Sequence, residues 1–75
     1  IDGLLSIDEF KEYFHLKKLP DEKSGIYHTV GGFVMHMIGR IPVTGDTFAM
    51  ETIKFEVVDM DGTRVDKILV KPLLK

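Results

Sequence analysis

Two stretches of the chain carry apolar side chains at helical spacing. Residues 7, 10 and 14 are apolar, which places them on one face of a helix. Ser6 and Glu9 form a capping box that predicts a helix from Ser6 to about His15. Thr29 is the best N-cap for a second helix, which Gly39 ends, with apolar side chains at positions 30, 33, 34, 37 and 38. We therefore expect two short helices, each with one buried face.

The last third of the chain changes to an alternating pattern. It predicts strands over residues 48–50, 53–60 and 63–70, with turns at Glu51-Thr52 and Asp61-Gly62. Residues 1–5 could be the end of a further strand. The expected fold is therefore α+β, a small antiparallel sheet of three to four strands with two helices packed on one face.

The turns also predict a register between the strands. The turn at Glu51-Thr52 sets Phe48 opposite Phe55, and a loop of Asp61 and Gly62 sets Phe55 opposite Ile68. These apolar pairs then share the inner face of the sheet. The same register pairs Met50 with Ile53, Ile53 with Val70, Glu56 with Lys67 and Val58 with Val65.

This register turns four apolar side chains outward, namely Val58, Met60, Val65 and Leu69. An exposed apolar cluster on so small a domain has two interpretations. It is either a half-covered face shielded by lysine stems, or a contact surface for another domain or a second copy of the chain. The second interpretation predicts these four residues as an interface.

Composition mainly excludes partners. Ten Lys and Arg against twelve Asp and Glu give the 75 residues a net charge of −2, so no basic surface for nucleic acid is expected. No cysteine is present, which excludes disulfides and thiolate zinc sites. The longest mainly apolar run, residues 30–38, is far shorter than the ~20 residues of a membrane span. Because the chain opens on Ile1 rather than Met, we expect a piece of a longer protein.

No catalytic constellation is recognisable in the sequence, so we do not expect an enzyme. None of the hydroxyl groups lies in a nucleophile motif. The three histidines, His15, His28 and His36, are interpreted as ordinary surface residues, since zinc needs three or four converging ligands.

Two segments remain as candidate ligand sites. The helix start at Thr29, Gly31 and Gly32 could admit a phosphate group to its backbone N–H groups, but close packing of the helix on the sheet explains the two glycines equally well. The aspartates Asp59, Asp61 and Asp66 resemble a calcium loop superficially. The longer acidic run and final Glu of such a loop are missing, Asp61 is explained by the turn, and Asp59 could pair with Arg64.

The order of several short motifs resembles the transporter-associated domain of the CorC/HlyC family. The resemblance covers nearly the whole chain. It is carried by Asp2-Gly3-Leu4-Leu5, Ile7-Asp8-Glu9, Tyr27, Thr29, Gly31-Gly32, Gly39-Arg40-Ile41-Pro42, Gly45-Asp46, Phe55-Glu56-Val57, Asp61-Gly62 and Arg64-Val65. It implies that residues 1–75 form one domain, cut from a longer bacterial membrane protein that also contains CBS domains.

The same resemblance implies a function. It suggests a non-catalytic module on the cytoplasmic face of the inner membrane, in a hemolysin-like or magnesium and cobalt efflux protein. Such a module would modulate ion transport through contacts with the neighbouring CBS and membrane domains, or with a second copy as a homodimer. The family's grouping with FAD-binding folds implies FAD or an adenine nucleotide as a possible ligand. The alternatives left open are therefore a flavin or nucleotide sensor and a divalent-cation sensor.

Overall fold

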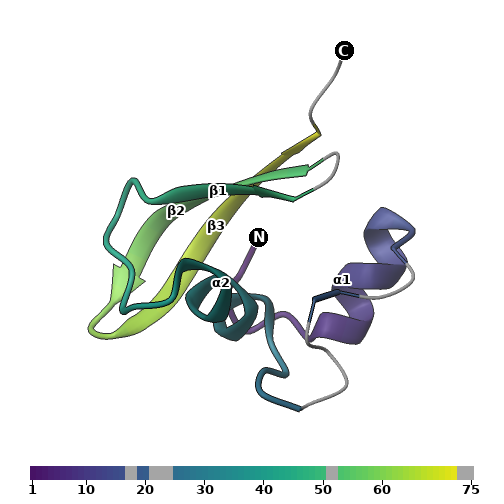
Figure 1. Ribbon diagram of the computed structural model, residues 1–75, viewed down its shortest axis with the longest axis horizontal. Helices are drawn as coiled ribbons and strands as arrows, with labels where there is room; N and C mark the ends of the chain where they lie inside the picture. The colour runs from purple at the N-terminus through teal and green to yellow at the C-terminus, as the bar shows by residue number, and fades with distance from the viewer. Residues whose placement is uncertain (17–18, 21–24, 51–52, 73–75) are drawn as a thin grey trace.

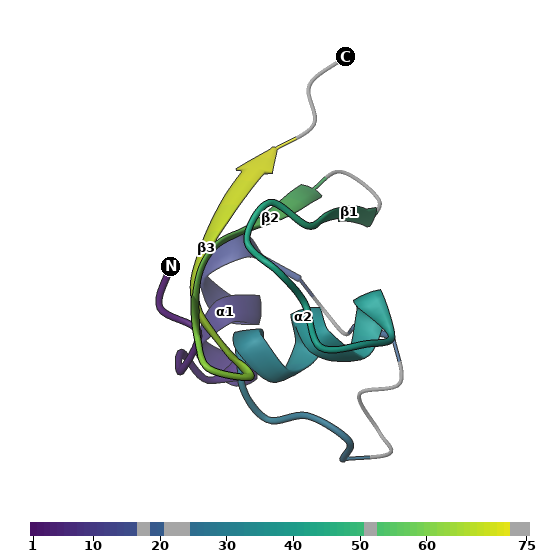
Figure 2. The ribbon, with the colours of Figure 1, turned by 90° about the vertical axis from the view of Figure 1, so that its left-hand side faces the viewer.

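Two helices and a three-stranded antiparallel sheet make up the computed structural model, which describes residues 1–16, 19–20, 25–50 and 53–72. The helices are α1 (Ile7–Phe14) and α2 (Val30–Ile38), and the strands are β1 (Thr47–Met50), β2 (Ile53–Asp61) and β3 (Arg64–Pro72). The strand order is β1-β2-β3. Both helices lie on the same side of the sheet (Figures 1 and 2), which confirms the predicted α+β architecture.

The helix ends follow the capping residues of the sequence. Ser6 Oγ accepts the backbone N–H of Glu9 at 3.1 Å and donates to its Oε1 at the same distance. Thr29 Oγ1 accepts the N–H of Gly32 at 3.1 Å. Left-handed residues end both helices, His15 (φ 59°) after α1 and Gly39 (φ 86°) after α2. Both predicted helices are confirmed, and neither helix of the described residues is long enough to cross a bilayer.

Aromatic rings connect the helices to the sheet. Phe55 of β2 is fully buried, and its ring centre lies 5.7 Å from those of Phe10 in α1 and Phe33 in α2. On the sheet itself, Phe48 stacks on Phe55 at 4.7 Å with the rings nearly parallel. This pairing confirms the predicted register of β1 and β2, in which Met50 also faces Ile53. The turn predicted at Glu51-Thr52 lies outside the described residues.

The predicted register of β2 and β3 is wrong. Asp61 pairs with Arg64, so the two-residue loop is Gly62-Thr63 rather than Asp61-Gly62. Of the two residues in this loop, only the first, Gly62, has a positive φ (64°), as in a type II′ turn. Each of these β2 residues therefore pairs with a β3 residue two positions later in the chain than the predicted partner. The observed partners are Ile53 with Pro72, Phe55 with Val70, Glu56 with Leu69 and Val57 with Ile68.

A local irregularity in the same pair of strands corrects the predicted outer face. Asp59 pairs with Lys67, out of step with the pairs on either side, and alternation is interrupted in both strands. Val65 therefore points inward and is 1% exposed, so its predicted outward position is wrong. Met60, which faces Val65, is half-buried against the core. Of the four residues predicted to face outward, Val58 (47% exposed) and Leu69 (41%) do so.

Residues 1–5, here called the N-terminal strap, run along the free edge of β3 (Figures 1 and 2). The N–H of Ile68 donates to the carbonyl of Ile1, and the N–H of Gly3 donates to that of Asp66, both at 2.8 Å. Regular pairing is limited to one bridge, between Asp2 and Lys67. The possible strand at residues 1–5 is therefore present as this bridge and its flanking hydrogen bonds.

Candidate functional sites

A junction of three backbone segments fixes the start of α2. Gly3 of the strap lies between β3 and α2. A Cβ atom added to Gly3 would be 2.0 Å from the carbonyl oxygen of Val65. A Cβ atom on Gly31 would be 2.9 Å from the carbonyl oxygen of Gly3 and 3.1 Å from that of Val65. Close packing thus explains Gly31, whereas Gly32 is less tightly enclosed, with its nearest contacts at 3.3 Å.

The N–H groups at the start of α2, the candidate phosphate site, already have acceptors. The strap supplies two of them and Thr29 supplies the other two. The donor–acceptor pairs are Val30 to the Leu5 carbonyl, Gly31 to the Gly3 carbonyl, Gly32 to Thr29 Oγ1 and Phe33 to the Thr29 carbonyl. A phosphate group would have to displace these bonds, so the geometry does not favour nucleotide or flavin binding here.

The three candidate metal-binding aspartates make separate local contacts. Asp59 Oδ1 accepts the N–H of Met60 at 3.0 Å. Asp61 pairs with Arg64 at 2.9 Å, the partner that the sequence had suggested for Asp59. Asp66 lies 3.4 Å from the ammonium of Lys67. Within the described ranges, no three His, Asp or Glu side chains are placed to hold a metal ion. His15 and His28 are exposed, and His36 packs beside the ring of Tyr27.

The segment between α2 and β1 is closed by a two-point ion pair. The Arg40 guanidinium contacts both carboxylate oxygens of Asp46 at 3.0 Å, and Asp46 Oδ2 also accepts the N–H of Val43 at 2.9 Å. The Asp46 backbone accepts the N–H of Val57 at 2.8 Å, which ties the segment to β2. The hydrogen bond from Arg40, followed by that from Val43, lowers the pKa of Asp46 below its ordinary value of 3.8.

This ion pair predicts a pH-dependent contribution to stability. A carboxyl group whose pKa is lower in the folded state stabilises that state above its unfolded pKa, and the contribution disappears as pH falls through the folded pKa. Asp46→Asn should therefore lower the melting temperature at pH 5–7, and this difference should shrink below about pH 3.8. Thermal unfolding followed by circular dichroism across this range measures the effect.

Arg40→Gln and the double variant provide the control. If the two side chains act together, the double variant should melt close to either single variant, because the second substitution removes nothing further. Additive losses that do not vary with pH would show that the ion pair does not stabilise the fold.

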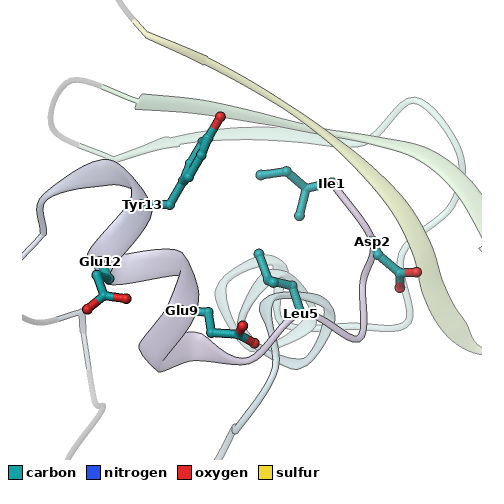
Figure 3. A pocket seen from close by; sticks show the side chains of 6 residues that line it. All are labelled: Ile1, Asp2, Leu5, Glu9, Glu12 and Tyr13. Carbon is teal, nitrogen blue, oxygen red and sulfur yellow. The ribbon is translucent and has the colours of Figure 1, made fainter.

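A shallow hollow, here called the groove, lies between the strap and α1 (Figure 3). It encloses about 650 Å³. The side chains of Ile1, Leu5 and Tyr13 point into it. Asp2, Glu9 and Glu12 also line it, but the carboxylates of Asp2 and Glu12 point away from the hollow. The groove could not be predicted from the sequence, because its two walls belong to different predicted elements. The available signal was Tyr13, an aromatic residue outside the buried 7, 10, 14 face of the helix and 74% exposed.

Comparison with sequence families gives one match over nearly the whole chain. The profile described as "Transporter associated domain" (CorC_HlyC) matches residues 1–73. The chain is 56% identical over 73 residues to the UPF0053 protein sll0260 of Synechocystis, covering 97% of this chain and 16% of that protein. It is 41% identical to the polyamine export protein of Escherichia coli K12, covering 93% of this chain and 15% of that protein.

More distant relatives carry other names. The magnesium and cobalt efflux protein CorC of E. coli is 31% identical, and the match covers 95% of this chain and 23% of that protein. Among solved structures, a domain of a Xylella fastidiosa hemolysin in complex with Mg²⁺ and Mn²⁺ is 36% identical (TM-score 0.81, covering 99% of this chain and 85% of that one). A domain of a CBS domain protein from Porphyromonas gingivalis is 25% identical (TM-score 0.80, covering 99% and 86%).

Proposed function

Because the chain belongs to the family of transporter-associated (CorC/HlyC) domains, we propose that it is a non-catalytic accessory domain of a larger membrane transporter. One observation carries this proposal. Nearly the whole chain matches relatives named as export or efflux proteins, yet it spans only 15–23% of their length. The remainder of such a parent would contain the membrane-spanning part and, as in the P. gingivalis relative, CBS domains. The domain would then lie on the cytoplasmic face of the membrane.

The cargo proposed for the parent is a cation, and an organic one is favoured. Identity to the E. coli polyamine export protein is 41%, against 31% to the magnesium and cobalt efflux protein. The two sensor alternatives receive less support from the geometry, because the N–H groups at the start of α2 have acceptors and the three aspartates are engaged separately.

Contact with neighbouring domains would act through the outer face of the sheet. Val58 and Leu69 are exposed there on adjacent strands, and Glu56 pairs directly with Leu69. Aliphatic side chains on a polar sheet face suit a modest interface that can form and separate. Met60 and Val65, the other members of the predicted interface, are absent from this face because they turn toward the core.

A double variant of the parent protein tests the proposal. Val58→Lys with Leu69→Lys should leave the melting temperature of the domain nearly unchanged, because surface substitutions usually alter stability by less than ~0.5 kcal/mol each. The same double variant should reduce cation export from cells that depend on the parent. Ala49→Lys, on the same face of the neighbouring strand β1, is the matched control. Normal export by the double variant, or an equal defect in the control, would contradict a docking role.

A further inference from the structure

The two edges of the sheet differ in how they are covered. Along β3, the strap bonds to the backbone of Asp66 and Ile68, and the strand carries two lysines and a proline, residues that protect edge strands from further pairing. β1 is the opposite edge, on the side away from the strap (Figure 2). Its four residues, Thr47–Met50, include no charged residue and no proline. Among the described residues, only those of β2 pair with this strand.

The backbone of β1 presents free hydrogen-bonding groups at its outer edge. The carbonyl of Asp46, just before the strand, accepts the N–H of Val57 in β2 at 2.8 Å. Backbone groups alternate in direction along a strand, so those of Phe48 also face β2, whereas those of Thr47 and Ala49 face outward. Within the part of the chain that the structure describes, these outward N–H and C=O groups have no hydrogen-bond partner. They are a template for one more strand.

We propose that the outer edge of β1 binds an extended segment of the parent protein as an additional strand, through the backbone of Thr47 and Ala49. Strand addition of this kind is a recurring way for a domain to bind a peptide. The chain spans 16% of its Synechocystis relative, so most of such a parent lies outside this domain and can supply the segment. This proposal goes beyond docking through the outer face of the sheet, and it rests on the proposed function for the existence of the parent.

Apolar side chains beside this edge indicate what the segment carries. Phe48 stacks on Phe55, and the ring of Phe33 in α2 lies 5.9 Å away. Phe48 is nevertheless only half-buried, as is Met37, one turn after Phe33 on the same side of α2. An apolar side chain at the inward position of the added strand would cover both. Because β1 is uncharged, the segment needs no charged residue to pair with it.

A single extended segment fits this edge better than a second copy of the chain does. α2 reaches beneath β1 (Figure 2), and its Phe33 contacts Phe48 there. A second copy that paired through its own β1 would have to fit its own α2 beside the first. An isolated strand brings no such helix, and the side of α2 next to Phe48 is then available to its inward side chain.

Hydrogen exchange of the β1 amides tests the proposal without a prior choice of segment. The 75-residue chain is compared with the same domain inside the purified parent, by mass spectrometry resolved to single residues. This chain covers 85% of the solved X. fastidiosa domain, so a domain of this size folds without the rest of its parent. Thr47 and Ala49 should exchange about tenfold more slowly, or slower still, in the parent, because a bonded amide must open before it exchanges. Phe48, whose backbone faces β2, should be equally protected in both.

Two variants at one position locate the added strand. Ala49→Pro removes an outward N–H group and no hydrogen bond to β2, a position where an edge strand accepts proline. In the parent, it should return Thr47 to the exchange rate of the isolated chain. Ala49→Thr keeps the N–H group and suits a strand, so Thr47 should remain protected. Circular dichroism of the two isolated variants checks that both fold.

Three results would overturn the proposal. They are equal exchange of Thr47 and Ala49 in the isolated chain and the parent, equal effects of Ala49→Pro and Ala49→Thr, and protection in the isolated chain that increases with its concentration. The last would place a second copy at this edge.

Failure here is distinguishable from failure of the accessory role. The double variant at Val58 and Leu69 leaves the backbone of β1 intact, so its export defect does not depend on protection of Thr47. Ala49→Lys also keeps both backbone groups of its residue, and therefore remains a valid control for the outer face.

Discussion

Gly3→Ala is expected to lower the free energy of unfolding by about 3 kcal/mol or more, the largest effect we expect from adding one methyl group to this chain. The new Cβ atom would lie 2.0 Å from the carbonyl oxygen of Val65, so the strap must move away from β3. That movement would break the hydrogen bonds from Gly3 to Asp66 and from Gly31 to Gly3, which are 2.8 and 2.9 Å long. The backbone of Gly3 has no positive φ, so the loss arises from the steric clash alone.

The measurement is thermal or urea unfolding of the 75-residue chain. A loss of 3 kcal/mol corresponds to a fall in melting temperature of roughly 12 °C or more for a domain of this size. Gly32→Ala is the matched control. Its Cβ atom would meet Thr29 and Tyr27 at 3.3 Å, and alanine favours a helix by up to ~1 kcal/mol, so stability should change by no more than about 1 kcal/mol. Equal effects of the two substitutions would refute the close junction at Gly3.

Val65→Lys is expected to unfold the domain or to cost about 4 kcal/mol or more. The side chain is 1% exposed, and the substitution both removes apolar packing and brings an ammonium group against the core. Val58→Lys, seven residues earlier and 47% exposed, should cost less than ~0.5 kcal/mol. The pair therefore distinguishes the observed strand register from the predicted one, in which both side chains point outward.

A milder pair keeps this test informative if Val65→Lys does not fold. Val65→Thr retains the shape of the side chain and adds only a hydroxyl group, which should cost roughly 1–3 kcal/mol when it is buried without a partner. Val58→Thr should be close to neutral. Similar stabilities for the two threonine variants would mean that Val65 is not part of the core.

The elements with local signals were predictable. Ser6 and Thr29 mark the helix starts, and the apolar positions after them mark the buried faces, because a capping bond and a helical face both involve residues only three or four apart. The pairing of Phe48 with Phe55 was equally local, since one short turn determines it. The close approach at Gly31 was also foreseeable, although nothing in the sequence identified Gly3 and Val65 as its partners.

The register of β2 and β3 could not be predicted by alternation alone. Asp61-Gly62 is a favoured turn sequence, but the chain places Gly62 first in the loop, and Asp61 instead closes the hairpin with Arg64. The irregularity at Asp59 then changes the side of the sheet on which later residues lie. The irregularity corresponds to the three-residue spacing of Val65 and Ile68. Both side chains are buried, whereas strict alternation would place them on opposite faces of the sheet.

The groove was unpredictable for a different reason. Its walls come from the strap and α1, and their proximity depends on the hydrogen bonds of the strap to β3. The sites predicted from the sequence were the helix start at Thr29 and the aspartates of the hairpin. Both segments have polar groups in suggestive order, but in the fold these groups are used by neighbouring backbone or by single lysine and arginine side chains.

The strap gives the fold a long-range contact between the two ends of the domain. Its hydrogen bonds join residue 1 to residue 68, so they close a loop that contains almost the whole domain. The entropy cost of closing a loop grows with its length, whereas the hairpin of β2 and β3 forms through near neighbours. The carbonyls of Gly3 and Leu5 nevertheless accept the first N–H groups of α2. A nine-residue helix is therefore complete only when the two ends of the domain have met, which couples its formation to that of the entire fold.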